Sequence, residues 1–307
     1  MKRLVLIDGH ALLHRAYHAF PLTLTTRKGE LVNAVYGFTR ILLSVLVDLK
    51  PHFLAVAMDL PKPTFRHQEY VGYQAQRPKM DEELSGQIKR VWEILDALNI
   101  PLFTKEGYEA DDVIGTLAKK IAKKKAIEVI IVTGDKDIMQ LIEEKIKVYV
   151  PKKGFADPEI FDQKKVKEFL GIKPSQIVDY KALIGDSSDN YPGVPGIGPK
   201  TAVELLEKYG SFQKIYQNLR QIKPILAEKL KTGRESGLLS QKLATIIINV
   251  SLKFSLEKCL LHDYDHQKAV KLFEELEFKS LIYKLPGMEE KPKEKKDKEE
   301  KKQMSFL

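Results

Sequence analysis

Cysteine is almost absent from this sequence of 307 residues. The single residue, Cys259, cannot form a disulfide within the chain, so the fold must depend on its hydrophobic core rather than on cross-links. Proteins that lack disulfides are typical of a reducing compartment, and we therefore expect a cytoplasmic location.

Long hydrophobic runs are also missing. Only four apolar residues lie between Arg3 and Asp8, too few for the apolar part of a signal peptide. The stretch Ile41–Val47 is much shorter than the roughly 20 residues that cross a bilayer. We therefore expect neither a membrane partner nor a secreted protein.

Acidic residues do not balance the basic ones. The formal net charge is +9, and the run from Glu289 to Lys302 contributes only one unit of it. With 43% hydrophobic residues the chain is long enough for one large or two ordinary domains. A basic body favours a polyanionic partner such as nucleic acid, although many lysine-rich proteins are basic for other reasons.

Acids nevertheless follow several apolar runs. Leu4–Asp8, Phe53–Asp59 and Val129–Asp135 resemble buried strands that end on an acid. Such runs predict an α/β fold with a mostly parallel central sheet and flanking helices, whose ligands bind beyond the carboxyl ends of the strands. Nine acids occupy strand ends or tight turns: Asp8, Asp59, Glu109, Asp111, Asp112, Asp135, Asp137, Asp186 and Asp189.

The spacing of these acids predicts metal ligands. A single Asp after a strand is commonly a turn or helix-capping residue. Here Glu109 and Asp112 are three positions apart, as are Asp186 and Asp189, and capping does not require such pairs. Many carboxylates in a small volume need cations, and oxygen ligands favour Mg²⁺ or Mn²⁺.

The hydrophobic pattern divides the chain into three parts. Residues 1–165 alternate strand-like and helix-like runs, residues 166–286 are mostly helical, and residues 287–307 form a charged tail that we expect to be disordered. Helical periodicity extends over Val35–Leu49, Glu83–Leu98, Ala110–Lys123, Ile138–Glu144, Lys164–Leu170, Pro174–Leu183, Lys200–Tyr209, Phe212–Asn218, Pro224–Lys231 and His266–Leu276.

Two further segments predict contacts with DNA. Gly185–Ala202 contains a glycine-rich hairpin before a helix, where exposed amides can bind phosphate. We assign this contact to Gly193, Val194, Gly196, Ile197, Gly198, Lys200 and Thr201. The segment Lys62–Lys79 interleaves aromatic and basic side chains, among them Arg66 and Tyr73, that can hold a single strand; the alternative is a solvated loop.

Together these motifs resemble the 5′ nuclease domain of bacterial DNA polymerase I, within the flap endonuclease family. The similarity extends from about Leu4 to Leu285. The matching strings are Asp8–Pro21, Thr64–Arg66, Glu109–Leu117, Thr133–Asp137, Gly185–Ala202, Leu243–Ile246 and Glu277–Lys279.

The resemblance implies a Mg²⁺-dependent 5′-3′ exonuclease and flap endonuclease of replication and repair. It implies a PIN-like sheet domain with an arch at about 61–82, and a helix–three-turn–helix that grips duplex DNA, with K⁺ as a candidate ion. Asp8, Asp59, Glu109 and Asp111 would serve one metal. Asp135, Asp137, Asp186 and Asp189 would surround a second, with Asp112 acting through water. The expected partner is DNA with 5′ flaps, nicks or single-stranded 5′ arms.

One departure from the family concerns the arch. Where relatives have Tyr-Lys-x-x-Arg, this chain has Tyr73–Arg77 with Gln74 at the lysine position. Arg77 is the matching catalytic candidate, and Lys79 is the candidate substitute for the missing lysine. Gln74 remains a DNA-contact candidate without the charge.

The tail ends in a second motif. Gln303–Leu307 is similar to a bacterial clamp-binding pentapeptide, with Gln303, Met304, Phe306 and Leu307 as the contact residues; the alternative is a frayed terminus. The expected partners are thus the sliding clamp and a separate DNA polymerase. We expect a monomeric nuclease near the nucleoid; the chain is either a standalone nuclease or a fragment of a longer one. Two other functions stay open: an RNA-directed nuclease, and a weakly catalytic DNA-binding adaptor.

Overall fold

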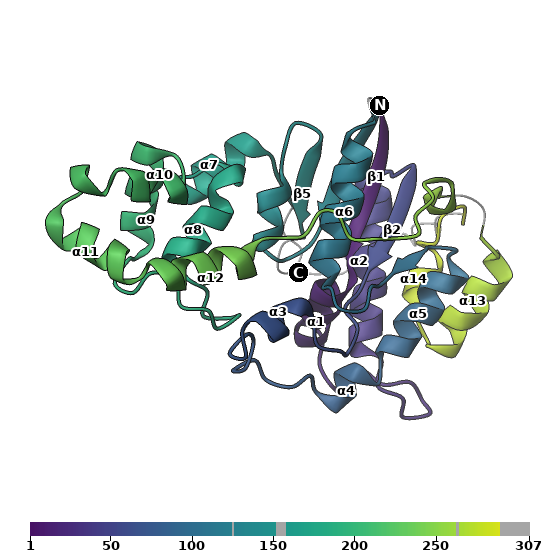
Figure 1. Ribbon diagram of the computed structural model, residues 1–307. Helices are drawn as coiled ribbons and strands as arrows, with labels where there is room; N and C mark the ends of the chain where they lie inside the picture. Colours follow the sequence, from purple (N-terminus) through teal and green to yellow (C-terminus); the bar gives the residue numbers. More distant parts are fainter. Residues whose placement is uncertain (125, 152–157, 262–263, 289–307) are drawn as a thin grey trace, which may run out of the picture.

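The computed structural model describes residues 1–124, 126–151, 158–261 and 264–288. The predicted clamp-binding residues Gln303–Leu307 lie outside these ranges. The centre of the structure is a six-stranded sheet in the order β3-β2-β1-β4-β5-β6 (Figure 1). Its strands are β1 Lys2–Asp8, β2 Phe53–Ala57, β3 Leu102–Phe103, β4 Ile127–Val132, β5 Ile146–Val150 and β6 Glu159–Phe161.

The sheet is parallel except at one edge. In the middle, Leu4 of β1 pairs with Phe53 of β2 on one side and with Val129 of β4 on the other. Only β6 runs antiparallel, beside β5. The mostly parallel sheet predicted from the apolar runs is therefore confirmed, and its carboxyl ends meet at one edge.

Helices cover both faces of the sheet because side chains alternate along β1. Val5 and Ile7 join one core cluster with α2 (Asn33–Leu49) and α5 (Ile88–Ala97). Leu4 and Leu6 join the other cluster with α6 (Ala110–Ala122). The remaining helices of this part are α1 Gly9–Ala19, α3 Phe65–Glu69, α4 Glu82–Ser85 and the 3₁₀ turn η1 Asp137–Leu141.

The helix expected over Glu83–Leu98 is broken in two. Buried Gln87 lies at the break, between α4 and α5. Its side-chain oxygen accepts the backbone N–H groups of Ala34 and Val35 at 2.9 and 3.2 Å, and its amide nitrogen donates to Asn33. Gln87 thus satisfies the first amides of α2, which local periodicity could not predict.

The helical domain lies to one side of the sheet (Figure 1). It comprises α7 Gln163–Leu170, α8 Ile177–Ile184, α9 Pro199–Tyr209, α10 Phe212–Gln217, α11 Pro224–Thr232 and α12 Arg234–Ala244, with 3₁₀ turns η2 Pro174–Gln176 and η3 Leu219–Gln221. Most of its buried apolar side chains belong to the same cluster as α6, whereas Leu243 and Ala244 of α12 form a small cluster with Tyr73 and Tyr191. Within the described ranges, no helix has the length and apolar character needed to span a membrane.

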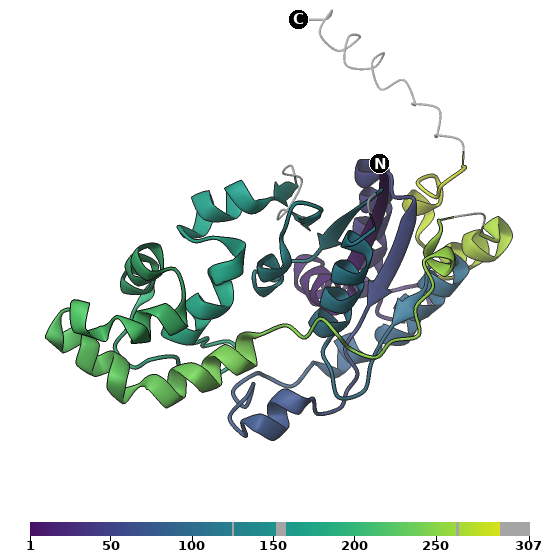
Figure 2. The ribbon, with the colours of Figure 1, turned by 45° about the horizontal axis from the view of Figure 1, so that its top comes forward.

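The predicted helical domain of 166–286 ends too late. After α12 the chain crosses α6 and returns to the far side of the sheet, where α13 (His266–Glu275) and α14 (Lys279–Ile282) lie near α5; η4 Glu257–Cys259 lies on the way (Figures 1 and 2). Phe273 is fully buried in the core cluster of α2 and α5. The C-terminal helices therefore complete the sheet domain.

Candidate active site

Asp8 marks the carboxyl edge of the sheet, because it ends β1 and caps α1. One carboxylate oxygen accepts the backbone N–H of Ala11 at 3.0 Å, and the other accepts the hydroxyl of Thr133, just after β4, at 2.6 Å. The side chain is 4% exposed. Burial raises the pKa of Asp8 to about 7, although both hydrogen bonds oppose the change.

Three more acids of the predicted first group lie beside Asp8. Glu109 caps α6, and the backbone N–H of Ala110 donates to Asp59 at 2.7 Å. Burial raises the pKa of Glu109 to about 7. It also raises the pKa of Asp111, and the nearby carboxylates add to this rise. The structure thus brings together the four acids that the resemblance assigned to one metal.

The second group straddles the two domains. The backbone N–H of Asp137 donates to Asp135 at 2.8 Å, in the turn after β4. Asp186 lies after α8, and Lys181 of that helix bridges Asp137 and Asp186. Burial raises the pKa of Asp137 to about 6, against the effect of Lys181. Burial alone would raise the pKa of Asp186, but hydrogen bonds from Lys181 and Ser188 lower it.

The predicted metal ligands are not preassembled. Among the residues that the structure describes, no three His, Cys, Asp or Glu side chains already converge on a common metal position. The donor set still fits a hard divalent ion, because oxygens surround the site and the buried Tyr191 hydroxyl has no hydrogen-bond partner.

Asp112 has a different role from the one predicted. It is fully buried, and both of its oxygens accept hydrogen bonds from Arg66, at 2.8 and 2.9 Å. The same oxygens accept the backbone N–H groups of Glu109 and Ile247. With all these donors around it, Asp112 anchors the fold and is not available to a metal, even through water, in this conformation.

Arg66 is likewise structural rather than a DNA contact. It is 2% exposed, and its guanidinium also donates to the carbonyl groups of Leu243 and Thr245, both at 2.9 Å. A second ion pair joins it to Glu109 at 3.2 Å. Arg66 therefore ties the arch segment to α6 and to the chain that leaves α12.

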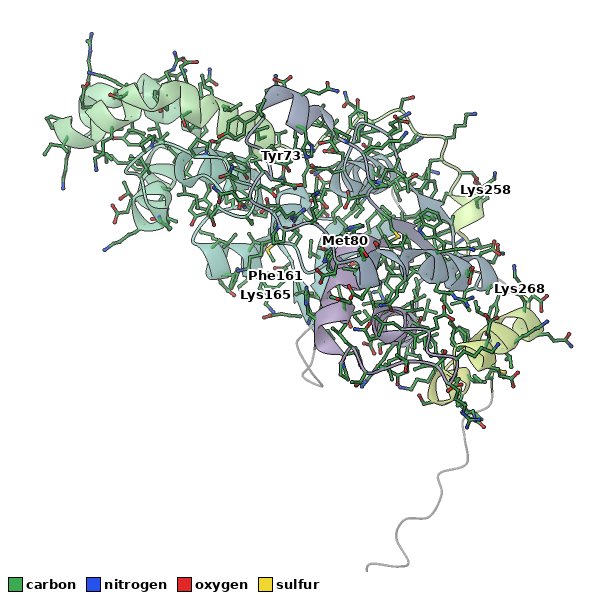
Figure 3. The ribbon with its side chains drawn as sticks, turned by 90° about the horizontal axis from the view of Figure 1, so that it is seen from below. Tyr73, Met80, Phe161, Lys165, Lys258 and Lys268 are labelled. Carbon is green, nitrogen blue, oxygen red and sulfur yellow. The ribbon has the colours of Figure 1, made fainter. Side chains whose placement is uncertain are left out.

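Tyr73 and Gln74 face the acids, not the solvent. Tyr73, labelled in Figure 3, is 3% exposed, and its single O–H donor lies between Glu109 at 3.3 Å and Asp189 at 3.2 Å. The Gln74 amide donates to Asp189 at 3.0 Å from a residue with φ of 54°. The predicted base-stacking role of Tyr73 does not fit this burial. Gln74, which stands at the position of the family lysine, therefore holds Asp189 in this chain.

The two catalytic candidates of the arch are exposed. Arg77 lies near α1, where its charge helps to lower the pKa of His14 to about 4; burial and the charge of His10 are the larger causes. These histidines are therefore neutral at pH 7. Lys79 is also exposed. The roles of Arg77 and Lys79 stay predictions.

The glycine-rich hairpin is anchored on α12 and exposes its turn at Gly196. The serine hydroxyl groups of Ser236 and Ser240 on α12 hold Gly193, and Gly196 has φ of 78° at the exposed turn. Val194 and Ile197 are 2% and 5% exposed, and their backbone N–H groups donate to the carbonyl groups of Leu183 and Val194, so both residues anchor the hairpin. Their predicted contact with DNA stays a prediction. Gly198, Lys200 and Thr201 begin α9, with Lys200 exposed.

Sequence reasoning missed Lys181 and Thr133 at this site. Thr133 stands directly after β4 in the Thr-Gly-Asp string, so its neighbour Asp135 could have pointed to it. Lys181 is a basic residue in an otherwise largely apolar helix, five positions before Asp186. Such a lysine signals a buried ion pair, but its acidic partner on the other domain is not apparent from spacing.

Two family models match the chain. The first, described as 5′-3′ exonuclease, N-terminal resolvase-like domain, covers residues 3–171. The second, described as 5′-3′ exonuclease, C-terminal SAM fold, covers residues 172–267. DNA polymerase I of Bacillus subtilis (strain 168) is 42% identical over 285 residues, which are 92% of this chain and 32% of that protein. DNA polymerase I of Caldicellulosiruptor bescii gives 42% identity, with 92% and 33% covered.

Solved structures share the fold at lower identity. A flap endonuclease from bacteriophage T5, in a pseudo-enzyme–product complex with DNA and metal ions, has a TM-score of 0.66 and 19% identity, with 90% of this chain and 100% of that chain covered. The catalytic core of Rad2 in complex with DNA substrate has a TM-score of 0.61 and 17% identity, with 90% and 87% covered. The chain spans about a third of the length of the curated polymerases.

Proposed function

The chain belongs to the 5′-3′ exonuclease family, and from this premise we propose that it hydrolyses DNA at 5′ flaps, nicks and single-stranded 5′ arms with two Mg²⁺ ions. Mn²⁺ would substitute. The observation that carries the proposal is the arrangement of eight acids in two adjoining groups, one at the carboxyl edge of the sheet and one between the two domains, close to the glycine-rich hairpin. The T5 relative has been crystallised with metal ions and with DNA, which supports the same ligands here.

The two acid groups would hold the metals. Asp8, Asp59, Glu109 and Asp111 would hold one ion, and the set for the other comprises Asp135, Asp137, Asp186 and Asp189. The ions supply concentrated positive charge, which stabilises the charge that a phosphodiester gains during hydrolysis. Because both groups lie next to the arch, the same charges also favour the phosphate backbone of a 5′ arm.

The protein side chains would position the substrate. The hairpin amides before α9 and the Lys200 ammonium would hold duplex phosphates, and exposed Arg77 would meet the strand near the acids. Lys79 is the second cation of the arch. Neutral His14 and His10 would not act as acids at pH 7. We further propose K⁺ at the hairpin, with backbone carbonyl groups of its turns as the ligands.

A labelled flap tests the proposed function. We expect a 5′-labelled DNA flap to be cut with Mg²⁺ and to stay intact with EDTA, whereas an RNA flap of the same sequence is cut more slowly. Faster cleavage of the RNA flap would favour the RNA-directed nuclease. DNA binding without any cleavage under Mg²⁺ would favour the adaptor.

Lys200→Ala should weaken duplex binding equally for all sequences. Each lysine–phosphate contact releases counterions, so the slope of log K against log salt should shrink by roughly one unit. Fluorescence anisotropy over a salt series measures the slope. Lys258→Ala is the matched control, since this exposed lysine lies on the sheet side, far from the hairpin (Figure 3). Equal slopes for both variants would place the duplex contact elsewhere.

The segment Gln303–Leu307 supports a clamp-binding proposal. Gln303, Met304, Phe306 and Leu307 follow a lysine- and glutamate-rich run, and such a tether raises the local concentration of nuclease at clamp-loaded DNA. Deleting Gln303–Leu307 should abolish binding to purified clamp in calorimetry and leave cleavage of naked flaps unchanged. Retained clamp binding in the deletion would refute this partner. After flap cleavage by this nuclease, a separate DNA polymerase would complete repair synthesis.

A further inference from the structure

Lys181 lies between two acids of the second group. Its ammonium nitrogen is 2.7 Å from Asp137 and bonds directly to Asp186. The three side chains are between 10% and 20% exposed, so solvent screens their charges only partly. Lys181 and Asp186 come from the helical domain, whereas Asp137 comes from the sheet domain.

The bonds of Asp186 leave one oxygen for a cation. The first oxygen, Oδ1, already accepts the backbone N–H groups of Ser188 at 2.7 Å and of Asp189 at 3.2 Å, together with the Ser188 hydroxyl. The second oxygen, Oδ2, bonds to Lys181. A metal ion that binds Asp186 through Oδ2 would meet the Lys181 ammonium at the same oxygen, and two cations in contact there repel each other.

We propose that Lys181 is an internal counter-ion, which occupies the second acid group without metal and leaves it when a divalent ion binds there. The inference rests on the proposed function, because it assumes that Asp137 and Asp186 are metal ligands. Two neighbouring carboxylates repel each other, and one ammonium group between them offsets that repulsion. The lysine thereby makes the second metal site weaker than its acids alone would make it.

The same charge affects DNA in the absence of metal. The phosphate backbone meets the acid groups as it approaches, and uncompensated carboxylates would repel it. Lys181 neutralises part of this charge. Removal of the lysine should thus have opposite effects on the two ligands: metal binds more tightly, and DNA without metal binds more weakly.

Mn²⁺ titration of the whole chain without DNA tests the first effect. Calorimetry and the electron paramagnetic resonance signal of free Mn²⁺ should reveal two sites in the wild type. In Lys181→Met the weaker site should tighten by at least about tenfold, because a repelling charge at contact distance is gone. Lys181→Gln should behave in the same way, and Lys181→Arg should stay near the wild type. Lys119→Met is the matched control, since Lys119 forms an ion pair with Glu143 away from these acids.

Flap binding in EDTA tests the second effect. Affinity should fall about tenfold in Lys181→Met, by the loss of one favourable charge, and not in Lys119→Met. Thermal unfolding verifies that each variant is folded. If Lys181→Met is not folded, the measurement is made on Lys181→Gln. An unchanged or weaker second Mn²⁺ site in a folded neutral variant overturns the inference. If the wild type binds no Mn²⁺, the proposed function fails instead.

Discussion

Asp135→Asn should abolish most cleavage and leave the fold and flap binding intact. Asp135 accepts the backbone N–H of Asp137 at 2.8 Å, and the asparagine oxygen can accept the same bond. The lost charge weakens the proposed metal site, and removal of one such electrostatic stabiliser costs about 10²–10³ in rate. Reduced repulsion toward phosphate should keep DNA binding equal or make it tighter. Single-turnover cleavage of a 5′-labelled flap measures the rate.

Asp162→Asn serves as the control for this substitution. Asp162 caps α7 with a similar bond to a backbone amide, at 2.9 Å from Lys165, but lies outside the two acid groups. Its cleavage rate should remain within about twofold of the wild type, as expected for an exposed cap with small effects on stability. A normal rate in Asp135→Asn would remove this acid from the metal assignment.

Arg66→Met should lower the free energy of unfolding by about 3–5 kcal/mol, because it leaves the buried Asp112 carboxylate without its partner. Urea unfolding followed by circular dichroism measures this change. Flap cleavage should also fall, since Arg66 contacts Glu109 at 3.2 Å and fixes the arch segment. Activity would thus fall because the arch segment is displaced, and not because Arg66 contacts the substrate.

The double variant Arg66→Met/Asp112→Leu separates the ion pair from other effects. Its destabilisation should be smaller than the sum of the two single changes, because no unpaired charge remains. The cost cannot vanish, since Asp112 also accepts the backbone N–H groups of Glu109 and Ile247. Arg90→Met is a control, as Arg90 pairs with exposed acids on the far side of the sheet. Strict additivity would show that Arg66 and Asp112 do not depend on each other.

Strands β1, β2 and β4 were predictable because each contains a continuous apolar run that needs no partner to be recognised. The edge strands β3 and β6 were not, since they have only two and three residues. The helix α12 was not: its sequence is polar and contains Gly237. Tertiary packing explains that glycine, because a β-carbon there would lie 2.7 Å from the ring of Phe212. The helix α1 was missed although Asp8 caps it, since the acid was interpreted as a strand end.

The acid site was predictable as a set but not residue by residue. Spacing and resemblance selected all nine acids, yet they could not separate Asp112 from the others. The difference depends on Arg66, which is 46 positions away in sequence and reaches Asp112 only in the folded chain. Lys181 likewise reaches Asp137, which belongs to the other domain, only in the folded chain. Long-range ion pairs decide which carboxylates are available to a ligand.

The return of the chain to the sheet domain has a consequence for the order of folding. Phe273 and Phe278 fill the core beside α2, and the Phe278 ring lies 5.2 Å from that of Tyr36. During synthesis, the sheet domain therefore cannot complete its core until the helical domain and the residues after it have been made. The helical domain is in effect an insertion that is joined to the sheet domain at both of its ends.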